Sequence, residues 1–165
     1  MRKSLLLVVA CLVAVGIIFY WLEKTRPPGE ISFAFPQKLS NEQTLTVPLT
    51  ISVTTPMNAA EFYFSFPTDL LSVKEIQTTG SIYQLWIKDS PSFNNDTGQI
   101  YIAGGLPKPG FVGRNGLIAK VVFTTKKSGT GKITLDETKT RILANDGQGS
   151  KITTSAWQPV NFEIR

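Results

Sequence analysis

The sequence predicts an all-β fold, a two-sheet β-sandwich of about nine strands, preceded by one N-terminal transmembrane helix. From residue 31 onward there is no helical period, and short alternating or apolar runs are separated by Pro, Gly, Asn and Asp. Phe62, Phe64 and Phe66 follow the period-two spacing of a strand that buries one face. Residues 5–22 contain no charged side chain. These observations divide the chain into an anchor at 1–22, a linker at 23–30 and a sandwich at 31–165.

The apolar segment at 5–22 has the length and composition of a membrane-spanning helix. A helix of this length extends about 27 Å, close to the hydrocarbon thickness of a bilayer. Tyr20 and Trp21 lie at its far end, where aromatic rings favour the membrane interface. We therefore expect a single-pass signal anchor in the cell membrane. The short tail before the anchor and the long domain after it favour an extracytoplasmic C-terminal domain.

Two other processing routes remain open for this segment. Ala14-Val15-Gly16 provides the small residues that a signal peptidase requires, so the segment could be a cleaved signal peptide. The sequence VVAC partly matches a lipobox, which would make Cys11 the lipidated residue. Either event would leave an apolar stretch at the new N-terminus, so an uncleaved anchor fits best.

The linker and the strands can be assigned in chain order. Pro27-Pro28 prevents the continuation of a helix and stiffens the linker. The sequence KSGTGK is typical of a tight turn between two strands. The runs with strand character lie at 31–35, 44–53, 59–66, 71–77, 82–87, 99–103, 116–125, 132–135, 140–144 and 160–164.

The composition argues against several classes of function. The chain has no histidine and one cysteine, Cys11, so neither an internal disulfide nor a thiolate zinc cluster can form. Much of the net charge of +5 comes from the first 26 residues, and the rest of the chain has no basic stripe that would bind nucleic acid. No nucleophile is paired with a base, so we do not expect an enzyme.

Two loops, NNDTG at 94–98 and ANDGQGS at 144–150, concentrate oxygen-bearing side chains. Neither has EF-hand spacing, so we expect hydrogen-bonded Asx turns instead of a metal site. Asn95-Asp96-Thr97 matches the sequence motif for N-glycosylation. The glycine-rich stretch at 104–116 lacks the phosphate-binding pattern and is expected to form a semi-rigid excursion between strands. We expect no cofactor.

Three stretches, in this order and spacing, resemble the cohesin domain family. They are AAEFYFSFPTDLLSV, GQIYIAGG followed by a loop and GLIAKVVFTTKKSGTGKITL, and ILANDGQGSKI, and together they cover roughly residues 31–164. The resemblance implies a nine-stranded sandwich with jelly-roll topology that binds dockerin modules, with any calcium belonging mainly to the dockerin. It also implies that the strands at 59–66, 99–103 and 117–125 are neighbours in one sheet.

The alternation then predicts which side chains point outward from that sheet. Phe62, Phe64 and Phe66 are expected in the core, together with Ile100, Ile102, Leu117, Ala119, Val121 and Phe123. The opposite face would form the partner-binding site, with Glu61, Tyr63, Gln99, Tyr101, Ile118, Lys120 and Val122. Tyrosine offers a rigid surface with one polar tip, which is favoured at binding hot spots. These residues could instead stabilise the sheet by cross-strand pairing, or lie beneath a loop.

The expected function is non-catalytic recognition outside the cytoplasm, with the chain held in the membrane through residues 5–22. The expected partner is a protein module, either dockerin-like or part of a surface assembly. A second hypothesis is a carbohydrate-binding module that stacks aromatic rings on a surface glycan. A third is a structural envelope subunit.

Overall fold

The computed structural model describes residues 11–17 and 29–165, of which 11–17 are helical. The predicted anchor at 5–22 lies mostly outside the described residues. Within the described residues, no helix has the length and apolar character needed to cross a membrane.

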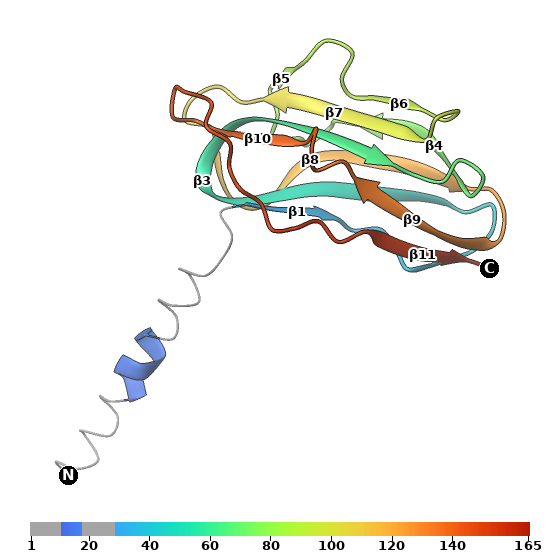
Figure 1. Ribbon diagram of the computed structural model, residues 1–165, viewed down its shortest axis with the longest axis horizontal. Coiled ribbons are helices and arrows are strands. Elements are labelled where there is room, and N and C mark those ends of the chain that lie inside the picture. Colours follow the sequence, from blue (N-terminus) through green and yellow to red (C-terminus); the bar gives the residue numbers. More distant parts are fainter. Residues whose placement is uncertain (1–10, 18–28) are drawn as a thin grey trace.

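The sandwich predicted after the linker is confirmed as a mostly-β fold built from eleven strands in the described residues (Figure 1). The number of strands exceeds the predicted nine because several strands are only two or three residues long. The bounds are β1 Gly29–Phe33, β2 Lys38–Leu39, β3 Thr44–Ser65, β4 Leu71–Gln77, β5 Leu85–Trp86, β6 Ser92–Asn94, β7 Gln99–Gly105, β8 Phe111–Thr125, β9 Gly129–Leu135, β10 Arg141–Ala144 and β11 Val160–Ile164.

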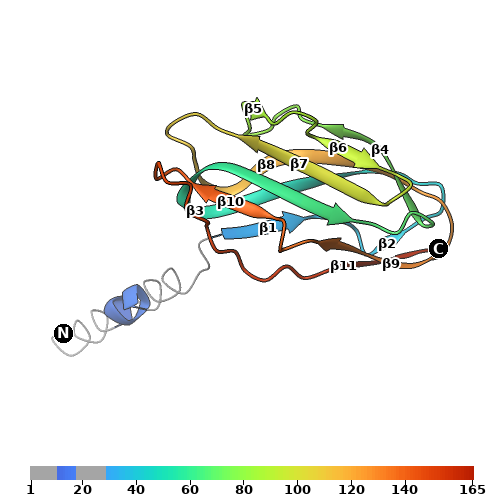
Figure 2. The same cartoon turned by 45° about the horizontal axis from the view of Figure 1, so that its top comes forward.

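Strand β3 folds back on itself and so contributes to both layers (Figures 1 and 2). Its first arm, residues 44–53, pairs with β1 on one side and β8 on the other. Its second arm, residues 59–65, pairs with β7 and β10. The two strands predicted at 44–53 and 59–66 are therefore these two arms. Strand β4 extends the first layer beyond β8, and β5 and β6 extend the second layer beyond β7.

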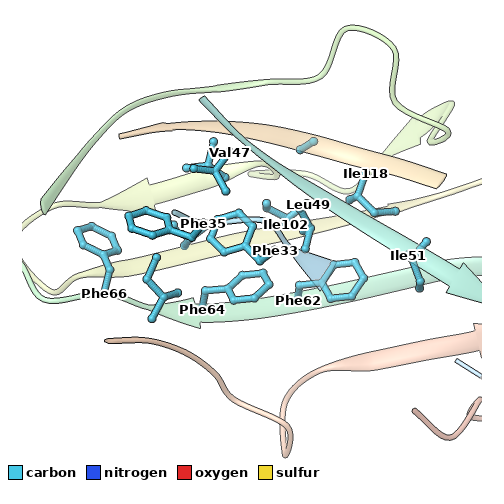
Figure 3. Close-up of a cluster of buried hydrophobic side chains, with 14 of the residues drawn as sticks. Phe33, Phe35, Val47, Leu49, Ile51, Phe62, Phe64, Phe66, Ile102 and Ile118 are labelled. Atoms are coloured by element: carbon cyan, nitrogen blue, oxygen red, sulfur yellow. The ribbon is translucent and has the colours of Figure 1, made fainter. Parts of the chain in front are cut away.

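The core lies between the two arms of β3, as Figure 3 shows. Phe62, Phe64 and Phe66 are buried, as their spacing predicts. Phe64 stacks on Phe33, with ring centroids 5.2 Å apart, and so joins the two layers. All buried residues of the hydrophobic cluster lie between Phe33 and Ile164, so a fragment spanning 29–165 contains the whole of this core.

Strand β8 corrects two expectations. The prediction that 117–125 lies beside 59–66 is wrong, because β8 pairs with the first arm of β3 and with β4 in the other layer. The prediction that Leu117 points inward and Ile118 outward is also wrong. A register shift pairs Leu49 with Ala119 but Thr50 with Leu117, which leaves Ile118 as an extra residue. A bulge of this kind reverses the alternation, and Ile118 is fully buried in the core.

The two loops rich in oxygen-bearing side chains form the Asx turns that the sequence predicts. Asn94 Oδ1 accepts hydrogen bonds from the N–H groups of Asp96 and Thr97. Asp146 Oδ1 accepts hydrogen bonds from those of Gln148 and Gly149.

Next to the first of these turns, the side chain of Asn95 connects the two layers. Its Oδ1 accepts the Val73 N–H at 2.8 Å, and its Nδ2 donates to the Val73 carbonyl at 2.9 Å. The amide thus takes the place of a neighbouring strand on the free edge of β4.

Candidate partner-binding face

The outer surface of the second layer carries the polar and aromatic side chains that alternation directs away from the core. We call this surface the tyrosine face and define it by Glu61, Tyr63, Gln99, Tyr101 and Arg141. These residues come from three adjacent strands, β10, the second arm of β3, and β7. Their positions follow from the burial of Phe62, Phe64, Ile100 and Ile142 on the same strands.

Two tyrosines form the centre of the tyrosine face. Tyr63 and Tyr101 are directly opposite each other on β3 and β7, with ring centroids 4.8 Å apart and an interplanar angle of 35°. Both are half-buried. Burial, followed by the proximity of Tyr63 and Glu61, raises the pKa of Tyr101 above its usual value. A hydrogen bond between the two tyrosine side chains raises the pKa further, so the Tyr101 hydroxyl keeps its proton and links the two rings.

An ion pair lies beside the tyrosines. Arg141 on β10 is directly opposite Glu61 on β3, and its Nε lies 2.6 Å from Glu61 Oε1. The Glu61 side chain is 21% exposed and that of Arg141 is 62% exposed. Arg141 thus holds the carboxylate in place while most of its own side-chain surface remains available to a partner.

A shallow groove of about 250 Å³ lies over the part of the tyrosine face formed by Tyr63, Gln99 and Tyr101. The tyrosines form its floor with Ser65 and Gln99, and Phe93 on β6 forms part of one wall. Asp136 and Lys139, which precede β10, form the opposite wall, with Lys139 Nζ 3.5 Å from Asp136 Oδ2. The hydroxyl of Thr138 and nearby backbone N–H groups lower the pKa of Asp136. The groove therefore offers apolar ring surface bordered by charges of both signs.

The structure brings together four of the seven predicted site residues, namely Glu61, Tyr63, Gln99 and Tyr101. Ile118, Lys120 and Val122 lie in the other layer and cannot share a contact surface with them. Ile118 is fully buried, and Val122 is 5% exposed between Thr46 and Glu75. Lys120 is half-exposed opposite Pro48.

Sequence reasoning missed four residues of this region: Phe93, Asp136, Lys139 and Arg141. The alternation of Ile142 and Ala144 would have directed Arg141 outward, but nothing in the sequence says that β10 lies beside Glu61. Phe93 belongs to a three-residue strand, which is too short to show a period.

The two tryptophans in the sandwich do not belong to the tyrosine face. Trp86 packs edge-on against Tyr83, and Trp157 packs edge-on against the buried Phe64. Among residues 11–17 and 29–165, no group of three or more His, Cys, Asp or Glu side chains could hold a metal ion.

Comparison with known proteins places this two-layer fold in a family. The Cohesin domain family matches residues 30–160, and the chain belongs to it. No curated protein matches the chain.

Several solved structures share the fold. The CaCohA2 cohesin of Clostridium acetobutylicum is 16% identical, with a TM-score of 0.64 over 84% of this chain and 92% of its own. The OlpC cohesin of Clostridium thermocellum, solved as a type I complex with the dockerin Doc435, is 12% identical, with a TM-score of 0.66 over 84% and 94%. A non-cellulosomal cohesin of the archaeon Archaeoglobus fulgidus is 18% identical, with a TM-score of 0.61 over 83% and 92%.

Proposed function

We propose that the chain is a non-catalytic recognition module that binds a protein partner through the tyrosine face. The observation that carries this proposal is the Tyr63–Tyr101 pair beside the Glu61–Arg141 ion pair on the outer surface of one layer. Paired tyrosines and an exposed arginine are the residue types enriched at protein interfaces. The adjoining groove gives such a partner a place for a side chain.

The partner that this family suggests is a dockerin-like module. The OlpC cohesin and other structures with the same fold are complexes with dockerins. Identity to these cohesins is low, so we argue the contact from the side chains of this chain alone. The partner surface would need to pack against the tyrosine rings and to place charges opposite Glu61 and Arg141.

The test is binding of fragment 29–165 to a panel of dockerin modules, measured by titration calorimetry with calcium and with a chelator. We expect at least one module to bind, and Tyr63→Ala, Tyr101→Ala and Arg141→Ala each to weaken that binding about tenfold or more. Lys120→Ala, on the outer side of the other layer, is the matched control and should leave binding unchanged.

The alternatives give different outcomes in the same assays. A glycan array that gives a specific ligand, with no binding to any protein module, would favour the carbohydrate-binding hypothesis. If Tyr101→Ala and Lys120→Ala weakened binding equally, the tyrosine face would not be the contact surface.

We further propose that residues 5–22 anchor the module in the cell membrane, with the sandwich outside the cytoplasm. The absence of charge in 5–22 and the aromatic residues at its end support this proposal. Flotation of the full chain with membranes after alkaline extraction tests the anchor. Protease access to the sandwich in intact cells tests the orientation, and the mass of the mature chain distinguishes the anchor from a cleaved or lipidated segment.

A further inference from the structure

The end of the sandwich at which β1 begins is fixed by strand register. Gly29 pairs with Val53 on β3, and Val53 pairs with Gly113 on β8, so three adjacent strands meet there. The loops that follow β7 and β10 lie at the same end, whereas the C-terminus lies at the opposite end (Figures 1 and 2). We call this the linker end, because residues 23–28, the part of the predicted linker that precedes β1, connect to it.

Three basic side chains, Lys108, Arg114 and Lys151, are exposed at the linker end. Arg114 directly follows Gly113. Lys108 belongs to the loop after β7, which is tied to the loop after β10 by a 2.7 Å hydrogen bond from Asn145 Nδ2 to the Pro109 carbonyl. Lys151 begins the segment whose Ser155 N–H donates to the Gly29 carbonyl at 2.9 Å.

None of these three side chains forms a hydrogen bond or ion pair within the described part of the chain. Three basic residues at the opposite end have partners within the fold. Lys126 donates to the Thr68 carbonyl, Lys127 pairs with Asp69, and Arg165 pairs with Glu163. The linker end therefore carries three positive charges that form no ion pair in the described residues.

An exposed apolar side chain lies on the same strand as Arg114. Val112 is 57% exposed and precedes Gly113, so it projects from the linker end without packing in the core. Three acidic residues lie near these charges. Glu30 is exposed, the carboxylate of Asp146 accepts hydrogen bonds from the N–H groups of Gln148 and Gly149, and Glu137, which lines a pocket with Lys151, accepts one from the Trp157 N–H. Exposed basic and apolar residues at one end of a domain are the composition that favours an anionic lipid surface.

We propose that the linker end docks on anionic lipid headgroups through Lys108, Arg114 and Lys151, with Val112 at the contact. This inference rests on the proposed membrane anchor, because an anchor ending at 22 keeps the linker end close to the bilayer. The six residues of 23–28 can extend only about 20 Å. The docked orientation holds the tyrosine face to the side, accessible to a partner that diffuses along the membrane surface.

The contact can be tested without the anchor, by sedimentation of fragment 29–165 with vesicles. We expect binding to vesicles that contain phosphatidylglycerol, weaker binding to pure phosphatidylcholine, and a decrease with added salt. Each basic residue near such a surface contributes about fivefold, so the combined Lys108→Gln, Arg114→Gln and Lys151→Gln variant should bind about 100-fold more weakly.

The matched control neutralises three lysines away from the linker end, Lys38→Gln, Lys126→Gln and Lys132→Gln, and should bind nearly as well as the unaltered fragment. Equal losses from the two variants, or no preference for phosphatidylglycerol, would overturn the proposal. Flotation of the full chain reports on the anchor separately. If the full chain fails to float but the fragment binds through the linker end, the proposed anchor is wrong and the proposed lipid contact is retained.

Discussion

At the residue scale, neighbouring side chains on β3 have opposite roles. Phe64 is buried between the layers, whereas Tyr63 lies half-exposed on the tyrosine face. We expect Phe64→Ala to lower the free energy of unfolding by about 3–5 kcal/mol, because it removes a core ring. Tyr63→Ala should cost only about 1 kcal/mol, the size of its contact with Tyr101. Urea denaturation of fragment 29–165 measures both.

The conservative variant Tyr63→Phe is the control, since it keeps the ring contact and should unfold at nearly the same urea concentration as the unaltered fragment. A Tyr63→Ala variant as unstable as Phe64→Ala would show that the tyrosine supports the fold and is not free to serve a partner.

The amide of Asn95 is the second residue whose role is sharply defined. Asn95→Ala removes both hydrogen bonds to Val73 and leaves a half-buried N–H and carbonyl without partners. We expect a loss of about 1–3 kcal/mol in the free energy of unfolding. Asp96→Ala, in the same turn, is the matched control and should stay within about 0.5 kcal/mol. Thermal denaturation that gives equal melting temperatures for the two variants would contradict this role.

At the element scale, the bulge in β8 decides which of two adjacent residues supports the core. Ile118 is fully buried and Leu117 is half-exposed. We expect Ile118→Ala to cost about 2–5 kcal/mol and Leu117→Ala clearly less. The urea midpoints of the two variants measure the difference. If Leu117→Ala cost more stability than Ile118→Ala, Leu117 would be the core residue, as the regular alternation in the sequence predicts.

The second arm of β3 and strand β8 together show how far the sequence could be used for prediction. Phe62, Phe64 and Phe66 were placed correctly, because alternation is a local property of the chain. The bulge at Ile118 was missed, because it depends on how β8 aligns with Leu49 and Thr50 more than 60 positions earlier. The presence of a strand can thus be predicted from local sequence, whereas its register and its neighbouring strands depend on contacts between distant parts of the chain.

At the scale of the whole molecule, stability should vary little between about pH 5 and 8, because the chain lacks histidine. Hydrogen bonds from Ser150 and from the backbone N–H of Gln148 lower the pKa of Asp146 from 3.8 to about 2. A pKa that is depressed in the folded state contributes stability above pH 4, which is lost as the pH falls toward 2. Urea midpoints at a series of pH values should show a plateau and then this decline.

Asp146→Asn should make the decline between pH 4 and 2 shallower, since the variant has no carboxylate to protonate at this position. Asp96→Asn is the control, because its carboxylate accepts no hydrogen bond in the described residues. A steep fall in stability between pH 6 and 8 would contradict the expected plateau.

The candidate site was only partly predictable for a reason that also belongs to this scale. Glu61, Tyr63, Gln99 and Tyr101 were found, because they alternate with buried residues on two strands that pair. Arg141 was missed and Ile118, Lys120 and Val122 were wrongly included, because the order of strands across a layer does not follow their order in the chain. A surface made of several strands is defined only when those strands are brought together.

The bridge between Asn95 and Val73 has a consequence for the sugar-attachment motif at 95–97. Nδ2 of Asn95 is the nitrogen that would carry the glycan, and in the folded chain it already donates to the Val73 carbonyl. Oligosaccharide transfer would have to occur before β4 closes against this turn. A chain glycosylated during synthesis would keep the two layers apart at this point, so a glycosylating expression host would produce a less stable protein.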